Sequence, residues 1–222
     1  MAKEVLISDY AKSLFTDYCA GVIYASVQNS SYNADLWQEI DDIIKNNISN
    51  YSLSDIKSIP AINATRRAYK IAGKDPNRYR PSAESLMRRV VNGNELYKIS
   101  TLVDLINLVS LKTGYSIGGF DNDKIAGTPT LGVGEKDEKF EGIGRGLLNI
   151  EGLPVYRDEI GGIGTPTSDE VRTSISDDTQ NIFVIINGYS GVEGLQEAVD
   201  YTVALLKEYA NATNIYTSIV KP

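Results

Sequence analysis

The sequence of 222 residues contains no histidine and a single cysteine, Cys19. The absence of histidine excludes Ser-His-Asp and Cys-His triads, imidazole metal ligands and an imidazole general base. One cysteine cannot form an intrachain disulfide, and a zinc cluster would have no second thiolate. We expect Cys19 to be a packed structural residue, and we expect neither a metal nor a cofactor. Any catalysis must use carboxylates, hydroxyls, Lys, Arg, backbone amides or the substrate itself.

The chain also lacks an apolar run of the roughly 20 residues that a membrane span requires. Its start, MAKEVLISDYAKSLF, does not show the basic residues, apolar run and small-residue cleavage site of a signal peptide. The composition, 42% hydrophobic and 23% charged, is sufficient for a continuous core. We therefore expect a cytoplasmic protein in which residues 1–222 form a single domain, without membrane association.

Nucleotide-binding signatures are missing as well. The glycine clusters GIGRG and GGIGT do not form a G-x-G-x-x-G sequence between a strand and a helix, and no G-x-x-x-x-G-K-[ST] loop occurs. A Rossmann or P-loop enzyme is therefore disfavoured. The glycines are interpreted as residues of turns and bulges.

Hydrophobic periodicity predicts helices in the first half of the chain and short strands in the second. CAGVIYASV (19–27) and NIFVIING (181–188) are typical of buried strands. Helices are predicted in ADLWQEIDDIIKNNI, in INATRRAYKIAG, from Pro81-Ser82 onward, in TLVDLINLVSLKTG and in GLQEAVDYTVALLKEYA. The sequence thus predicts a mixed α+β fold, with a largely antiparallel β-sheet core and packed helices.

Two details of this pattern make local predictions. Ser190 and Glu193 have the spacing of a capping box, which predicts the start of the last helix. Asp104, Asn107 and Ser110 recur every three residues in an otherwise apolar helix, so they share a narrow stripe. The stripe either forms hydrogen bonds within the fold or lines a pocket.

Positive charge is concentrated in residues 66–89. This stretch carries eight Lys or Arg against Asp75 and Glu84, a local balance of +6, whereas the whole chain is at −7 and the remainder is therefore at −13. Tyr69 and Tyr79 lie among the cations, which is compatible with phosphate contacts and base stacking in RNA recognition. The alternative is that the stretch pairs with the protein's own carboxylates. Helical periodicity places Arg88 and Arg89 on an outward face.

A second polar segment, GTPTSDEVRTSISDDT (164–179), is rich in hydroxyls and contains Arg172. Together with Gly161 and Gly162 it could form a pocket whose backbone amides and guanidinium hold a carboxylate or an ester carbonyl. A solvated loop is the equal alternative.

Several of these segments resemble one known domain. PSAESLMRRVVNGNELYKISTLVDLINLVSLKTGYSIGGFDNDKIAG and SDDTQNIFVIINGYSG are similar to the tRNA-binding and editing domain of the bacterial phenylalanyl-tRNA synthetase beta subunit, and GGIG falls near its glycine-rich turn. The resemblance is clearest over residues 60–200. The chain has no room for the synthetase catalytic core, so it resembles a freestanding version of this domain.

The resemblance implies an α+β fold that binds tRNA, aminoacyl-tRNA or an amino acid, and an aminoacyl-tRNA deacylase activity that acts in translation quality control. Such an activity would act as a second sieve on a mischarged ester. The candidate residues on this interpretation are Arg172, Thr165 and the backbone of Gly161 and Gly162 for the carbonyl, Asn187, Asp104, Asn107 and Gly118 for the ligand pocket, and Arg66, Arg67, Arg88 and Arg89 for RNA phosphate.

Two positions depart from the family pattern. The family's histidine falls on Gly118, and its pocket glutamate falls on Asn187, which can form hydrogen bonds but cannot ionise. The alternative function is therefore a non-enzymatic module that binds a small ligand or a protein segment and has lost editing activity.

Overall fold

The computed structural model describes residues 3–222, and its centre is an antiparallel sheet of four strands in the order β10-β2-β9-β3. The strands are Cys19–Ser26 (β2), Ser116–Asp121 (β3), Asn181–Gly188 (β9) and Thr213–Val220 (β10). Strands β2, β3 and β9 are buried almost throughout. Apolar residues on both faces of a strand require cover on both sides of the sheet.

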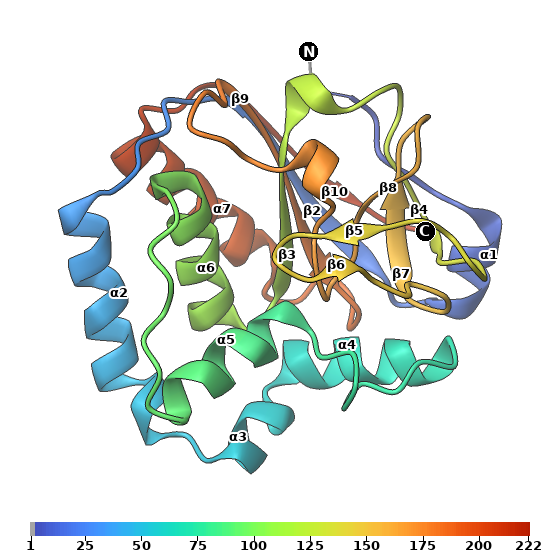
Figure 1. Ribbon diagram of the computed structural model, residues 1–222, viewed down its shortest axis with the longest axis horizontal. Coiled ribbons are helices and arrows are strands. Elements are labelled where there is room, and N and C mark those ends of the chain that lie inside the picture. Colours follow the sequence, from blue (N-terminus) through green and yellow to red (C-terminus); the bar gives the residue numbers. More distant parts are fainter. Residues whose placement is uncertain (1–2) are drawn as a thin grey trace.

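Helices cover one face of this central sheet, and a second sheet covers the other (Figure 1). The helical layer contains α2 (Ala34–Asn46), α5 (Ser82–Val91), α6 (Thr101–Thr113) and α7 (Leu195–Ala210). The second sheet has the order β1-β4-β7-β8, with β1 (Leu6–Ile7), β4 (Thr130–Val133), β7 (Pro154–Arg157) and β8 (Gly162–Gly164). This arrangement confirms the predicted α+β fold with largely antiparallel sheets.

The remaining elements are short, apart from one helix. They are α1 (Asp9–Leu14), α3 (Leu53–Ser58), α4 (Pro60–Ile71), the β5 and β6 hairpin (Glu141–Gly142 and Gly146–Leu147), and the 3-10 helices Ile48–Asn50, Asn122–Lys124 and Val171–Thr173. Helix α4 ends before Gly73, whose φ of 82° is in the left-handed region that favours glycine. Within residues 3–222, no helix has both the length and the apolar character needed to span a bilayer.

Two local expectations differ from the structure. The capping box at Ser190 and Glu193 is wrong, because α7 begins after Gly194, which has a φ of 74° and provides no side-chain cap. The edge strand β10 was not predicted at all. Its sequence, TNIYTSIV, is largely exposed at the edge of the sheet and therefore has no clear alternation of buried and exposed residues.

Candidate functional site

A cavity of about 320 Å³ lies on the helical side of the central sheet, between α5, α6, the edge strand β3 and the segment 165–175. Most of its wall is apolar, formed in part by Leu86, Ile99, Val103, Ile106, Ile117 and Ile175. Polar groups also line it, among them Ser82, Asn107, Ser110, Thr165, Ser168 and Asp169. An apolar cavity with a few polar groups is typical of a small-ligand site, and its size suits a group as large as an amino acid.

Asp169 is held at this cavity by a cradle of glycines. Its Oδ2 accepts a hydrogen bond of 3.1 Å from the backbone N–H of Gly119. A Cβ at Gly164 would lie 2.7 Å from Oδ1 of Asp169 and 2.6 Å from the ring of Phe120, and a Cβ at Gly118 would lie 3.4 Å from the same Oδ1. The carboxylate therefore occupies space that exists because these positions lack side chains.

Burial raises the pKa of Asp169 to about 7, although the hydrogen bond from Gly119 opposes the shift. Within the described part of the chain the carboxylate forms no ion pair that would offset its partial burial. A carboxyl group that changes charge near neutral pH beside a cavity is a candidate functional group.

The glycine cradle makes a paired prediction. Gly164→Ala should lower the free energy of unfolding by about 1–3 kcal/mol, because the new methyl group overpacks the space of Asp169 and Phe120. Gly161→Ala is the control, because a Cβ there meets nothing within 4 Å and the backbone is not left-handed. It should leave stability unchanged or raise it by about 0.4–1 kcal/mol. Urea denaturation of both variants measures the difference, and equal losses would contradict the cradle.

The turn before Asp169 is fixed by its own polar groups. The Thr165 hydroxyl accepts hydrogen bonds from the N–H groups of Thr167 and Ser168, both at 3.1 Å, and donates one to the carbonyl of Ser168. Such a turn replaces the missing secondary structure with local hydrogen bonds. Thr165 lines the cavity, but its hydroxyl is already engaged in the turn that positions Asp169.

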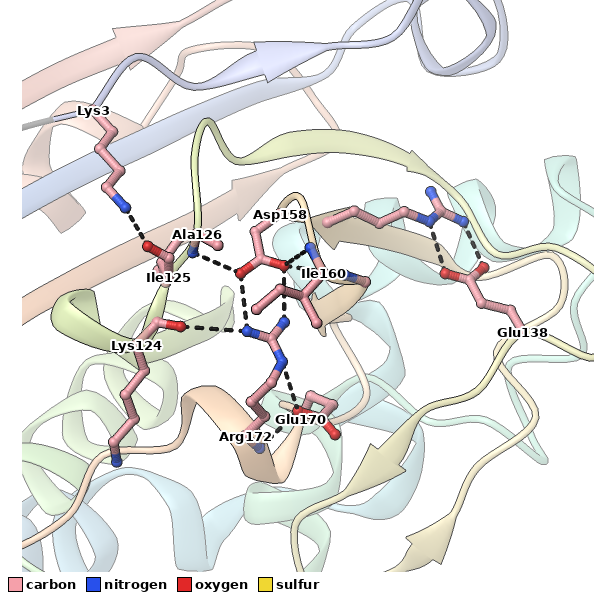
Figure 2. A network of polar contacts seen from close by, with 11 residues as sticks. Lys3, Lys124, Ile125, Ala126, Glu138, Asp158, Ile160, Glu170 and Arg172 are labelled. Carbon is pink, nitrogen blue, oxygen red and sulfur yellow. Dashed lines mark hydrogen bonds and ion pairs between the residues drawn. The ribbon is translucent and has the colours of Figure 1, made fainter.

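Arg172 does not line the cavity. Figure 2 shows its guanidinium against Asp158, with bonds of 3.0 and 2.9 Å, and beside Glu170. Burial favours a higher pKa for Asp158, but Arg172 and three backbone N–H groups, one from Gly161, lower it below its usual value. This bidentate pair ties segment 165–175 to the β7–β8 turn, so the structure gives Arg172 an anchoring position.

Gly118 and Asn187 lie on the opposite face of the central sheet from the cavity. In β9, Asn187 shares its face with Ile185, which pairs with Gly118, and successive residues alternate between faces. The amide of Asn187 accepts a 2.8 Å bond from Tyr18 and donates a 3.0 Å bond to the carbonyl of Ser116. Both polar groups of the Asn187 amide are thus hydrogen-bonded. Neither Gly118 nor Asn187 lines the cavity.

The polar stripe of α6 divides between its two interpretations. Asp104 is buried and accepts a 2.7 Å bond from the indole of Trp37 and a 3.1 Å bond from the N–H of Ile99, so it holds the fold together. Asn107 and Ser110 line the cavity. Neither Gly161 nor Gly162 lines the cavity. Gly162, which lies in β8, packs against Phe140.

The four predicted phosphate-binding arginines occupy different environments. Arg66 is buried and pairs with Glu84 at 2.7 Å, so it cannot reach RNA from this position. Arg88 lies 3.7 Å from the same carboxylate with a side chain 19% exposed, which differs from the outward face expected for it. Arg89 is partly exposed and stacks on Tyr97. Arg67 is exposed, and its side chain forms no hydrogen bond or ion pair with other residues of the described range 3–222.

The fold and the cavity define a candidate small-ligand site on an α+β domain of layered sheets and helices. A family model described as the B3/4 domain matches residues 64–211, so the chain belongs to the B3/4 domain family, whose domain is found in the phenylalanyl-tRNA synthetase beta subunit. This confirms the resemblance drawn from the sequence. No curated protein matches the chain.

Among solved structures, the chain is similar to an N-terminal fragment of the phenylalanyl-tRNA synthetase beta subunit from Pyrococcus horikoshii. The identity is 16% and the TM-score 0.48, and the similarity covers 98% of this chain and 54% of that fragment. The chain thus spans about half the length of the fragment.

Proposed function

We propose that this chain binds the aminoacyl end of a tRNA, or an amino acid, in the cavity between α6 and β3. The observation that carries the proposal is the meeting of Asp169, Asn107 and Ser110 at one mainly apolar cavity of about 320 Å³. Membership of the B3/4 family, whose domain occurs in a tRNA synthetase subunit, supports an aminoacyl ligand over other small molecules.

Cationic side chains near the cavity support contacts with the phosphate groups of an RNA. Arg89 lies one helical turn beyond the cavity residue Leu86, on the same side of α5. Arg145 is exposed on the β5–β6 hairpin, which contributes Ile143 to the cavity wall. Phosphate groups next to a bound aminoacyl group would meet these side chains, whereas Arg66 would remain in its buried pair.

The test is the affinity for acceptor-stem minihelices, charged with amide-linked amino acids or uncharged. We expect the preferred charged form to bind about tenfold more tightly than the uncharged form. Val103→Trp fills the cavity and should remove this preference, whereas Val192→Trp, at an exposed position outside the cavity, should keep it. A preference that survives Val103→Trp would contradict the proposal.

Binding without hydrolysis is the form of the function that the residues at the family's two editing positions favour. Gly118 has no side chain, and Asn187 cannot ionise and is fully hydrogen-bonded. We therefore propose that the editing residues which the resemblance assigns to these positions have been lost. A panel of mischarged tRNAs distinguishes the alternatives, since deacylation faster than in buffer would establish an ester hydrolase acting in trans.

A further inference from the structure

One outer edge of the central sheet is the strand β10, whose backbone is open to an additional strand. Within residues 3–222, β10 pairs with β2 alone, and residues 213–220 form no backbone hydrogen bond outside that ladder. A register shift lies between Thr213 and Tyr216, and residues 216–220 pair regularly after it. The outward N–H and C=O groups of this regular part are therefore available to a strand from another chain.

The strand β10 lacks the residues that usually prevent an edge strand from pairing. Its sequence, TNIYTSIV, contains no charged residue and no proline, although 23% of the whole chain is charged. Lysines, other charged side chains and prolines are common protections of a sheet edge. The irregularity at residues 213–216 affects only the start of the strand. The rest of the edge is suited to strand addition.

A basic groove follows one face of this edge. It lies between β10 and residues 3–7, and alternate residues of β10, from Tyr216 to Val220, form one of its sides. Glu4 is among its lining residues. Three lysines line it as well: Lys3, Lys12 and Lys221. The ionisable groups of the groove thus sum to +2, whereas the chain as a whole is at −7.

The ammonium groups of these lysines have unused hydrogen-bonding capacity. Figure 2 shows that Lys3 donates one bond, to the carbonyl of Ile125. Lys12 and Lys221 are exposed, and their side chains form no hydrogen bond or ion pair with other residues of the described range 3–222. An ammonium group can donate three hydrogen bonds, and a carboxylate accepts them with charge assistance. The groove therefore favours a ligand that carries carboxylates.

We infer that β10 is the docking edge for an extended acidic peptide segment of another protein. The segment adds a fifth strand to the central sheet, and every second side chain, a carboxylate, points into the lysine groove. In such strand addition the main-chain hydrogen bonds provide affinity, and the contacts of alternate side chains provide specificity. The inference is independent of the ligand cavity, which lies at the opposite edge of the sheet, beside β3.

Charge favours this occupant over a second copy of the chain. Two copies paired in antiparallel fashion through β10 would place their lysine grooves on the same face of the joined sheet, next to each other. The like charges would then repel. An RNA would pair with the lysines but would leave the backbone groups of β10 without strand partners. An acidic extended peptide satisfies both.

The experiment uses the capped octapeptide TEVEVEVT, in which glutamate alternates with valine. Its controls are TEEEVVVT, which has the same composition without the alternation, and TKVKVKVT, which has the opposite charge. We expect the wild-type protein to bind the alternating acidic peptide about tenfold more tightly than either control in calorimetric titrations. Lys12→Glu combined with Lys221→Glu should remove this preference. Lys57→Glu, at an exposed position of α3 outside the groove, should keep it.

Methylation of the peptide backbone tests the strand addition itself. In an extended strand, the N–H groups of all the glutamates point toward one edge and those of all the valines toward the other. Of two peptides, one N-methylated at the glutamates and one at the valines, we therefore expect one to bind about tenfold more weakly and the other to keep its affinity. Any other pattern would overturn the inference.

The remaining outcomes identify other occupants. Equal binding of the three unmethylated peptides, or binding of none, would overturn the inference. Tighter binding of a uridine oligonucleotide than of TEVEVEVT would assign the lysines to RNA. A wild-type dimer in sedimentation that TEVEVEVT does not dissociate would assign β10 to a second copy. The peptide comparison uses the wild-type protein, so it holds even if a lysine variant folds poorly, and it is separate from the minihelix experiment that tests the proposed function.

Discussion

Replacing Arg66 with methionine should lower the free energy of unfolding by about 3 kcal/mol, the lower end of the range for breaking a buried ion pair. Glu84 has a fully buried side chain, and Arg66 is its close partner at 2.7 Å. Without Arg66, the nearest cation to Glu84 is Arg88 at 3.7 Å, and Oε1 of Glu84 already lacks a hydrogen bond. The remaining attraction from Arg88 keeps the loss at the lower end.

A double variant and a neighbouring residue provide the controls. Arg66→Met with Glu84→Gln removes both charges of the close pair and should recover part of the stability, because the buried carboxylate is gone and Arg88, whose side chain is 19% exposed, is the only charge that loses its partner. Arg67→Met changes the same residue type at an exposed position and should alter stability by no more than about 0.5 kcal/mol. Equal losses for Arg66→Met and Arg67→Met in chemical denaturation would show that the pair at Glu84 does not stabilise the fold.

The stability of the protein should fall as the pH rises from about 4 to about 7, and Asp169 should cause most of this change. Its pKa is raised to about 7 in the folded state and is about 3.9 in an unfolded chain. The folded state therefore binds more protons between these values, and stability is lost as the pH rises. We expect a difference of about 1–2 kcal/mol between pH 5 and pH 8, less than the full shift implies because the carboxylate is only partly buried.

Asp169→Asn should flatten this profile, so that the variant is more stable than the wild type at pH 8. The chain contains no histidine, so this range is largely free of other titrations. Asp104, whose pKa burial also raises, remains in both proteins and cancels in the comparison. Denaturant titrations of both proteins at pH 5, 6, 7 and 8 provide the measurement. A wild-type profile parallel to that of Asp169→Asn would mean that Asp169 is already ionised at pH 5.

The sequence predicted the long elements because each has a clear hydrophobic period. The strand 181–188 and the helices at 34–46 and 101–113 lie where the apolar spacing placed them. The environment of Arg66 was missed, although a signal was present. Arg66 lies four residues after Ile62 and three before Tyr69, on the buried side of α4, whereas a count of charge does not separate Arg66 from the other cations of the stretch.

Asp169 could not have been identified from its neighbours in the sequence. Asp177 and Asp178 lie in the same polar segment but are exposed. What distinguishes Asp169 is its contact with Gly118, Gly119 and Gly164, two of which come from a strand 50 residues earlier in the chain. Local composition cannot indicate such a contact, because the contact depends on how β3 packs against the segment 165–175.

The two faces of the central sheet explain why only some of the candidate ligand residues line the cavity. A motif gives positions along a strand, whereas the cavity belongs to one face only. Asn107 and Thr165 lie at the cavity, whereas Asn187 faces a layer that Tyr18 and Phe183 already fill. The resemblance therefore gives the correct fold, whereas the position of the cavity depends on which side of the sheet is open.

A crystal structure with 3′-leucylamino-3′-deoxyadenosine, a stable mimic of a charged tRNA end, tests the central claim most directly. We expect the leucyl side chain to lie between α6 and β3, in the cavity beside Asn107 and Ser110. A mimic bound on the opposite face of the sheet, beside Tyr18 and Asn187, would contradict it.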